Sequence, residues 1–204
     1  MNEIKNLLEI IRKMKTTVIL ILFVVFVLFY YKPLITEVVT IKVKKPDEVK
    51  KDINNNIIID QLLNDLMLKY KGDRGYIFRF HNGVKFYDGK HKNHQSLAFE
   101  VCGRGISSEK MELQNLPTSL FPVFLQEVML NKMIYSDVND IKENATRIAL
   151  KEQGIKSIIA SPIFKDGYFV GYIGLDYVKE FSPLDMDYHE FKKNTDEIGR
   201  LLTN

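Results

Sequence analysis

The sequence predicts an α+β domain with an antiparallel sheet flanked by helices, preceded by one transmembrane helix and a linker helix. Three observations support this fold class. Residues 16–31 run without a charge, a glycine or a proline. Between Gly75 and Val178 apolar residues recur with period two in several segments, which is typical of strands with one buried face. Helical periodicity precedes, interrupts and follows these segments, an order typical of α+β folds.

The apolar run is long enough to cross most of a bilayer. At a rise of about 1.5 Å per residue it extends roughly 24 Å, against about 30 Å of hydrocarbon, and Lys15 and Lys32 extend to the headgroups on either side. No small-residue cleavage site follows Tyr31, so a signal peptide is disfavoured. We therefore expect an uncleaved single-pass helix over residues 16–35. Its membrane-facing side chains include Val18, Leu20, Phe23, Phe26 and Tyr30.

Charge is distributed unevenly along the chain. In residues 1–71 Lys and Arg outnumber Asp and Glu by four, whereas the remainder has one acidic residue in excess. A basic segment beside a membrane suits anionic lipid, and a near-neutral domain argues against a nucleic-acid partner. Basic residues close to the apolar run favour a cytoplasmic N-terminus and a domain on the non-cytoplasmic side. Those further along favour the reverse orientation. We expect the first orientation, with the domain on the non-cytoplasmic side.

Two short segments flank the expected membrane helix. Residues 1–15 carry apolar residues at helical spacing, which fits either an amphipathic helix on the membrane surface or an extension of the membrane helix. Residues 36–51 form a charged linker, and Pro46-Asp47-Glu48 is typical of a helix start. The helix over 47–71 has an apolar stripe wide enough to pack on the domain and to pair with a second copy. We expect oligomerisation through Ile57, Leu63, Leu66 and Tyr70.

The domain of residues 52–204 includes this helix and continues with strands. Tyr76–Phe80 alternates with period two, and Asn82-Gly83 predicts a tight hairpin turn before a return strand. A third strand is expected over Ser96–Val101. The remaining expected elements are a helix over 117–130, a strand over 133–138, a helix over 142–153 ended by Gly154, strands over 155–164 and 168–178 joined at Lys165-Asp166-Gly167, and a last helix opened by Ser182-Pro183.

The stretch from Gly154 to Val178 resembles the second half of a GAF domain. The matching positions are Ala160, Ser161 and Pro162 at the end of one strand, and Gly171, Gly174 and Asp176 in the next. The resemblance covers roughly Asp52 to Leu202 and implies a GAF/PAS-like fold. The two glycines also suit a close approach of a helix or ligand to the sheet, and proline belongs near a strand edge or bulge.

Departures from the family restrict the ligand. The signature of cyclic-nucleotide-binding GAF domains is not reproduced, its nearest counterpart being Lys142-Glu143-Asn144, and Cys102 lacks the surroundings of a bilin-attaching cysteine. We therefore expect no cofactor. The candidate ligand-binding residues are Arg79, Glu100, Arg104 and Tyr172, which would converge on a pocket beside the sheet. In the alternative, the three charged residues pair with one another on a solvated face and Tyr172 belongs to the core.

Catalytic and metal-binding motifs are absent from the sequence. It contains no P-loop, GxSxG, HExxH or paired CxxC motif. His91 and His94 are three residues apart, but zinc requires further ligands, and the surrounding lysines and asparagines favour a solvated loop. We therefore expect neither enzyme activity nor a metal.

The layout of the whole chain carries a second resemblance. A short N-terminus, one membrane span, a charged linker helix and an α+β domain resemble the plan of the T-even bacteriophage lysis holin, with similar segments at Tyr76–Phe80 and from Ser161 to Gly171. It implies a non-enzymatic, holin-type lysis protein of the host inner membrane, whose domain controls association or partner binding. The alternative is a membrane-anchored GAF sensor of a small ligand. The expected partners are the lipid bilayer, further copies of the chain and a protein regulator.

Overall fold

The structure is a computed structural model of the whole chain. It describes residues 4–6, 18, 20, 21, 23–27, 29, 30, 46–85, 89, 91–131, 134–179 and 186–203. The chain divides into two compact units, residues 1–50 and 51–204, which are taken one at a time below.

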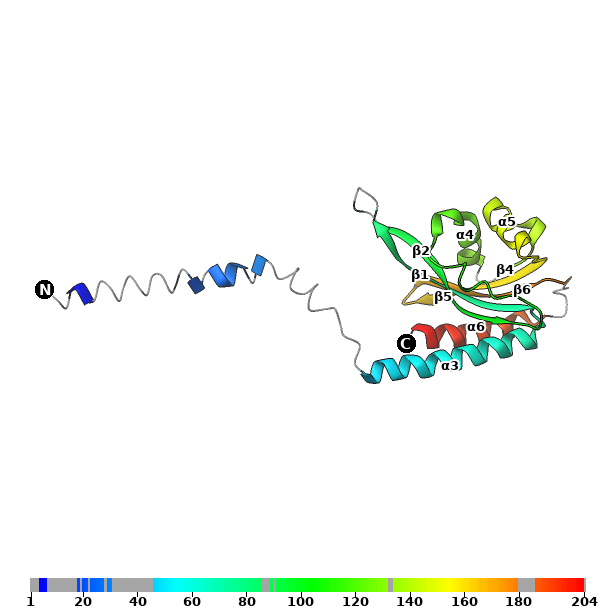
Figure 1. Cartoon of the computed structure of the whole chain (residues 1–204), viewed down its shortest axis with the longest axis horizontal. Helices are drawn as coiled ribbons and strands as arrows, with labels where there is room; N and C mark the ends of the chain where they lie inside the picture. Colours follow the sequence, from blue (N-terminus) through cyan, green and yellow to red (C-terminus); the bar gives the residue numbers. More distant parts are fainter. Residues whose placement is uncertain are drawn as a thin grey trace. The chain divides into compact units, whose positions relative to one another are not determined.

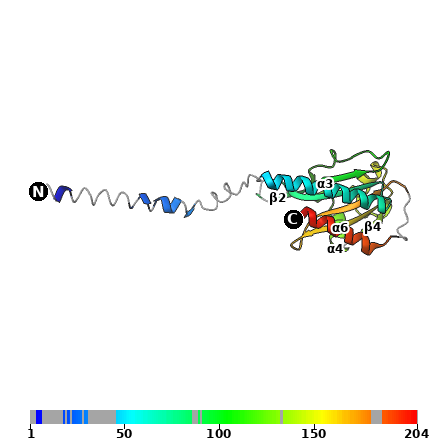
Figure 2. The same cartoon turned by 90° about the horizontal axis from the view of Figure 1, so that it is seen from below.

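The described residues form a six-stranded antiparallel sheet in the order β3-β2-β1-β6-β5-β4. Helices α3 and α6 lie side by side on one face of this sheet, and α4 and α5 cover the other (Figure 1 and Figure 2). The predicted α+β class, with flanking helices on an antiparallel sheet, is thus confirmed. The bounds are α3 Pro46–Lys69, β1 Arg74–Lys85, β2 His91–Cys102, β3 Leu116–Pro117, α4 Pro122–Asn131, β4 Ile134–Asp137, α5 Asn144–Glu152, β5 Ser157–Lys165, β6 Tyr168–Tyr177 and α6 Tyr188–Thr203.

One hydrophobic core fills the space between the sheet and the pair α3 and α6. Leu63 and Tyr70 recur at helical spacing on α3 and meet Ile77 and Ile173 from the two central strands. Phe191 of α6 packs edge-on against Tyr70, with ring centroids 5.1 Å apart. Burial of this stripe fixes α3 against the sheet, because tertiary packing supplies most of the stability of an amphipathic helix.

A second core lies between the opposite face of the sheet and the pair α4 and α5. Tyr76 and Phe78 point to this face because they alternate with Ile77 along β1. The Phe78 ring stacks on Tyr172 of β6 at 5.1 Å, and Phe124 of α4 meets the same tyrosine edge-on at 5.7 Å. This aromatic cluster forms much of the wall of the cavity described below.

The prediction of a hairpin turn at Asn82-Gly83 is wrong. Strand β1 continues through this dipeptide to Lys85, with Asn82 paired to Asn93 of β2 and an irregular register between Asn82 and Lys85. The connection to β2 includes Gly89, whose φ is +82°. An Asn-Gly step favours a turn only through its tolerance of positive φ. Here the ladder to β2 extends past it, and Asp88-Gly89 offers the same turn chemistry further on.

The predicted ends of β5 and α5 are confirmed. Asp166 and Gly167 both have positive φ, +51° and +81°, as a two-residue hairpin turn requires. Gly154, with φ +72°, follows α5. Pro162 lies beyond Ala160, the last residue of β5 that pairs with β4. The N–H that proline lacks is therefore not needed for a hydrogen bond between β5 and β4.

Two helices begin later than predicted. Residues 118–120 form a 3-10 turn, and α4 starts at Pro122, where proline is tolerated in the first turn. The described α6 starts at Tyr188, and the Asp187 carboxylate accepts hydrogen bonds from His189 N and Glu190 N at 2.9 and 3.0 Å. Asp187 is therefore the N-cap of this helix. The predicted cap, Ser182, lies outside the described residues.

Gly171 and Gly174 are required by close contacts within the sheet rather than by a helix or ligand. A Cβ at Gly171 would lie 2.2 Å from the carbonyl oxygen of Phe78 on β1. One at Gly174 would lie 2.3 Å from the carbonyl oxygen of Ile159 and 2.5 Å from the hydroxyl of Tyr76. Gly174 thus makes room for the Tyr76 ring, which lines the cavity.

The unit of residues 1–50 contains the predicted membrane segment. Its described residues are helical, and the rings of Phe26 and Tyr30 stack at 5.6 Å. The side chains of Val18, Leu20, Phe23, Phe26 and Tyr30 are exposed. Among the residues that the structure describes, no helix has the length and apolar character needed to cross a membrane. Several residues of the predicted 16–35 helix, and most of segments 1–15 and 36–51, lie outside the described residues.

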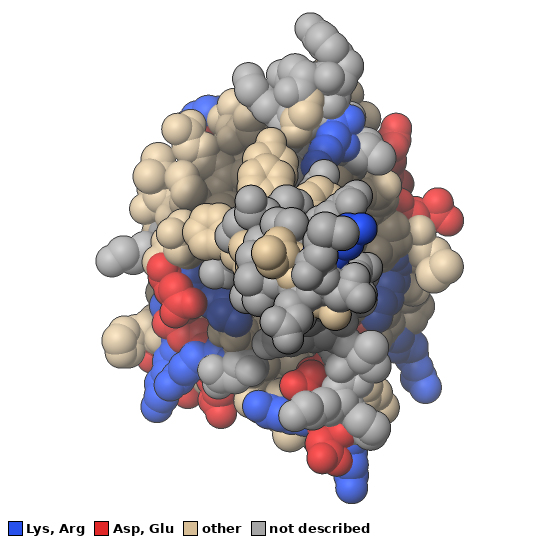
Figure 3. All heavy atoms as spheres, turned by 90° about the vertical axis from the view of Figure 1, so that its left-hand side faces the viewer, with Lys and Arg blue, Asp and Glu red and all other residues tan. Residues whose placement is uncertain are grey.

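Charges of both signs are interspersed on the surface. Figure 3 shows Lys and Arg mixed with Asp and Glu around the margin of one face, with uncharged side chains at its upper left. This mixture fits the near-neutral composition of residues 72–204.

Candidate functional site

A cavity of about 80 Å³ lies between the sheet and the helices α4 and α5. Its walls are mainly apolar and aromatic, and its polar groups come from the two central strands, from β2 and from α5. The lining residues are Arg74, Tyr76, Phe78, Gln95, Leu97, Leu113, Leu116, Phe121, Phe124, Thr146, Ala149, Leu150, Gln153, Ile158, Tyr172 and Asp176. An apolar cavity with a few convergent polar groups is the usual form of a small-molecule site.

Glu143 joins the two helices that cover the cavity. Its carboxylate accepts hydrogen bonds from the N–H groups of Val123 and Phe124 in the first turn of α4, both at 3.2 Å. The same carboxylate accepts from Thr146 Oγ1 of α5 at 3.2 Å. A negative charge is favourable at this helix N-terminus because its N–H groups are otherwise unpaired. The contacts hold α4 and α5 together over the sheet.

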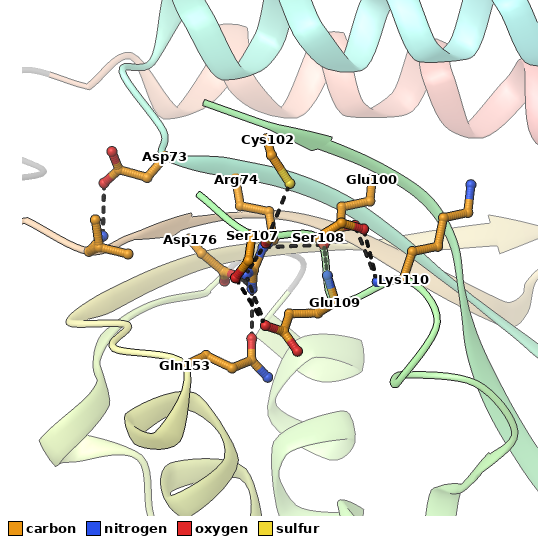
Figure 4. A network of polar contacts seen from close by, with 11 residues as sticks. Asp73, Arg74, Glu100, Cys102, Ser107, Ser108, Glu109, Lys110, Gln153 and Asp176 are labelled. Carbon is orange, nitrogen blue, oxygen red and sulfur yellow. Dashed lines mark hydrogen bonds and ion pairs between the residues drawn. The ribbon is translucent and has the colours of Figure 1, made fainter. Parts of the chain in front are cut away.

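Arg74 is the centre of a buried polar network beside the cavity (Figure 4). Its Nη1 donates to Gln153 Oε1 at 2.6 Å and to Asp176 Oδ2 at 3.4 Å. Its Nη2 donates to the carbonyl oxygen of Ser107 at 3.0 Å and lies 3.8 Å from Glu109 Oε1. Its Nε is 3.3 Å from Glu100 Oε1, close enough for an ion pair, but it is not aligned for a hydrogen bond. One guanidinium therefore faces three carboxylates.

Glu100 also fixes the segment that follows β2. It accepts hydrogen bonds from the N–H groups of Glu109 and Lys110, at 2.9 and 3.2 Å, and from Ser108 Oγ. These contacts fold the segment back over the Arg74 side chain, which is 4% exposed. The network is thereby shielded from water, which strengthens its electrostatic interactions.

Burial perturbs the titration of Asp176. Removal from water raises its pKa from the ordinary 3.8 to about 7, while Arg74 opposes this increase and Glu100 adds to it. Burial also raises the pKa of Tyr76 and of Tyr172 well above the usual value, and the Asp176 carboxylate acts in the same direction on both. Buried groups with such shifted pKa values often mark functional sites.

The structure separates the four residues predicted to bind a ligand. Tyr172 is buried and lines the cavity. Glu100 lies behind the cavity wall and contacts Arg74, which does line it. Arg79 and Arg104 are exposed, on β1 and in the turn after β2. The structure thus brings Tyr172 and Glu100 toward one site through Arg74 and leaves the two arginines outside it.

Sequence reasoning missed the polar residues that line the cavity, chiefly Arg74, Gln95, Gln153 and Asp176. A signal was present for two of them. In both central strands a charged residue continues the alternation of the cavity-facing side chains, Arg74 before Tyr76 and Asp176 after Gly174. A charge at a position that the pattern expects to be buried indicates a paired or functional group.

The predicted association surface on α3 is largely internal to the domain. Leu63, Leu66 and Tyr70 are buried, and Ile57 is 52% exposed. The role of the four residues in oligomerisation stays a prediction, but only Ile57 offers its side chain to a second copy. The exposed apolar side chains of α3 are Val49, Ile53, Ile57, Ile58 and Leu68.

No group of three or more potential metal ligands occurs among the described residues. His94 is buried and pairs in the sheet with His81, whose Nε2 lies 2.9 Å from Ser96 Oγ. The side chain of His91 lies outside the described residues. Cys102, the single cysteine, is not among the residues that line the cavity, and its Sγ donates to the carbonyl oxygen of Ser107 at 3.7 Å.

Comparison with known proteins identifies the fold. No protein-family model matches the chain, and no curated protein matches its sequence. Among solved structures, the blue-light absorbing form of the PixJ GAF domain from Thermosynechococcus elongatus is 10% identical with a TM-score of 0.58, over 74% of this chain and 86% of that one. The GAF domain/HD domain protein from Geobacter sulfurreducens is 12% identical with a TM-score of 0.53, over 72% and 91%.

A third similar structure holds a ligand. The phycocyanobilin-bound GAF domain from a cyanobacterial phytochrome is 16% identical with a TM-score of 0.56, over 76% of this chain and 88% of that one. At these identities the likeness concerns the fold alone. The domain has a GAF fold, as its sequence predicted, whereas the resemblance to a phage holin and the membrane anchor have no support in these comparisons.

Proposed function

We propose that this protein is a sensor whose GAF domain binds a small molecule in the cavity between the sheet and α4 and α5. The observation that carries this proposal is the cavity itself, an apolar space that ends at the buried network of Arg74 and Asp176. A structural core has no need of such a charged group, because burying it costs free energy unless it is fully paired. The protein acts through a partner and not as an enzyme.

The route from the cavity to the partner begins at α3. The cavity-lining Arg74 follows the end of α3 by a few residues, and its neighbour Asp73 forms two hydrogen bonds, one with the end of β6 and one with the residue after it. Asp73 N donates to the carbonyl oxygen of Asp176 at 2.9 Å, and Asp73 Oδ2 accepts from Val178 N at 2.8 Å. A ligand that displaces Asp176 therefore acts directly on the residue pair that anchors the C-terminal end of α3.

The size of the cavity restricts the ligand. Pockets for drug-sized ligands measure about 300–1,000 Å³, whereas this cavity measures about 80 Å³. A bilin or a cyclic nucleotide does not fit such a space, and the cysteine that could attach a bilin does not line it. The proposed ligand is a compact molecule of few non-hydrogen atoms.

The comparisons favour the sensor over a holin-type lysis protein, because the neighbours in fold include bilin-bound GAF domains. We further propose that residues 16–35 anchor the sensor in a membrane and that copies of the chain associate, on the grounds of the uncharged run and the exposed stripe of α3. Protease accessibility of the C-terminus in spheroplasts determines on which side the domain lies. A full-length chain that is fully protected from protease indicates a domain on the cytoplasmic side. A full-length chain that is released from the membrane indicates an unanchored protein.

A matched pair of α5 variants tests the sensor function. Ala149 lines the cavity, so Ala149→Leu adds carbon atoms to it, whereas Ala145 is exposed on the same helix. A library of compact fragments is screened against the full chain by ligand-detected NMR. We expect fragments that bind the wild type and Ala145→Leu but not Ala149→Leu. If no fragment depends on Ala149 in this way, the cavity is not a ligand site and the proposal fails.

A further inference from the structure

Among the described residues that line the cavity, two buried acceptors and one buried donor lack a hydrogen-bond partner, and the donor, Arg74 Nε, is held in an ion pair with Glu100. Asp176 Oδ1 and Gln95 Oε1 are buried, and neither has a hydrogen-bond partner among the described residues. The two residues are 3% and 2% exposed, and both line the cavity. Buried acceptors without donors are costly, so each atom marks a place where a ligand would supply an N–H or O–H group. The two places are separate, because Asp176 pairs with Arg74 and Gln95 pairs with Phe80, six residues further along β1. Asp176 Oδ1 lies at the end that holds the charged network.

The terminal nitrogens of Arg74 and the hydroxyl of Thr146 already donate to groups of the protein. Arg74 directs its Nη1 to Gln153 and Asp176 and its Nη2 to the Ser107 carbonyl. Thr146 Oγ1 donates to Glu143. A ligand that offers only acceptors, such as a carboxylate, would have to displace one of these bonds or compete with Glu100 for Arg74 Nε.

The charge around the cavity is acidic. The Arg74 guanidinium lies within 3.3–3.8 Å of Glu100, Glu109 and Asp176, and Arg74 is the one Lys or Arg among the described residues that line the cavity. Lys110 Nζ lies 5.8 Å from the ring centroid of Phe99, a residue of the core on the α3 side. The excess of carboxylates attracts a cation and repels an anion, an effect that is strong where water is excluded.

The walls suit a cation with an apolar body. Tyr76, Phe78, Phe124 and Tyr172 line the cavity with aromatic rings, whose faces attract cations. The aliphatic side chains, including Leu97 and Leu150, line the rest of the cavity. Acceptors, acidic charge and aromatic faces thus select the same chemistry.

We infer that the cavity takes a small primary ammonium ion with a short, branched apolar body. Its ammonium group donates to Asp176 Oδ1, and its alkyl group fills the space against the aromatic rings that line the cavity. This inference rests on the proposed function, since it names the ligand class of the same site.

The test compares three probes of the same shape and different charge. Isobutylammonium, isobutanol and isobutyrate are titrated into the full chain at about pH 8, and binding is followed by ligand-detected NMR. We expect isobutylammonium to bind at least about tenfold more tightly than isobutanol, with isobutyrate weakest, in line with the value of a charge-assisted hydrogen bond. Equal binding of amine and alcohol, tighter binding of isobutyrate, or no binding of the amine overturns the inference.

Two variants locate the selectivity. Asp176→Asn keeps the size of the side chain and removes its charge, so we expect the amine to lose its advantage over the alcohol while the alcohol still binds. Asp166→Asn, at the exposed turn between β5 and β6, makes the same chemical change far from the cavity lining and should leave the amine preference intact. An amine preference that survives Asp176→Asn, or is lost in Asp166→Asn, contradicts the assignment.

A measurement on the wild type alone keeps the inference testable if a variant misfolds. The amine requires ionised Asp176, which shares its surroundings with Arg74, Glu100, Tyr76 and Tyr172. The affinity for isobutylammonium should therefore rise about tenfold from about pH 6 to about pH 8, while that for isobutanol stays constant. A constant amine affinity overturns the inference. If neutral or anionic fragments bind, and their binding is lost in Ala149→Leu, the sensor function is supported but the inference of an ammonium ligand is overturned.

Discussion

Asp176 is almost completely buried beside Arg74, so its titration should make the stability of the domain depend on pH near neutrality. Burial raises its pKa from 3.8 to about 7 in the folded chain, whereas the unfolded chain keeps the ordinary value. Between these two values the folded chain binds more protons than the unfolded chain. The free energy of unfolding should therefore fall as the pH rises from about 4 to about 7, and this contribution should be constant above that range.

The size of the effect follows from the two pKa values. A shift of one pKa unit between the folded and the unfolded chain corresponds to about 1.4 kcal/mol. The shift of Asp176 from 3.8 to about 7 therefore corresponds to at most about 4 kcal/mol. Asp176→Asn resembles the protonated carboxyl and cannot ionise. Relative to the wild type, we expect the variant to gain up to about 4 kcal/mol of stability between about pH 4 and about pH 8.

The assay is urea unfolding of the full chain at a series of pH values. The chain contains no tryptophan, so unfolding is followed by far-ultraviolet circular dichroism. Asp166→Asn, an exposed aspartate at the β5–β6 turn, serves as the control and should retain the wild-type dependence on pH. If Asp176→Asn follows the wild type in parallel across this range, the carboxyl is not held neutral by burial and the reasoning is refuted.

Further predictions concern the folding of the domain. Residues 52–204 alone should be soluble and unfold cooperatively, since domains of this size bury enough apolar surface; an aggregating product would refute this boundary. Gly89→Val should reduce the free energy of unfolding by about 1–2 kcal/mol, measured by thermal unfolding, because Gly89 has a φ of +82°. Gly83→Val, within β1, should cost less, and equal costs would contradict a β1–β2 connection through Gly89. Phe191→Ala should cost about 3–5 kcal/mol and Phe164→Ala, 43% exposed, much less in urea unfolding; similar losses would contradict the difference in burial between the two rings.

The sequence by itself determined the features that depend on local chemistry. Alternation along Tyr76–Phe80 and helical spacing on α3 predicted the α+β class, because one face of each element has to be buried. Asp166-Gly167 and Gly154 predicted a turn and a helix end, because few residues tolerate positive φ. Local signals also misled where two of them competed, as at Asn82-Gly83, since the extent of a strand depends on its partner.

Only the tertiary structure decided which residues meet at the cavity. Arg74 is 79 residues from Gln153 and 102 from Asp176 along the chain, and it reaches both because β1 pairs with β6 and α5 covers that face. Periodicity places a side chain on a face but does not fix the order of the strands, so it could not bring these groups together. For the same reason the pattern on α3 did not show that Leu63 and Leu66 face the sheet and Ile57 faces solvent.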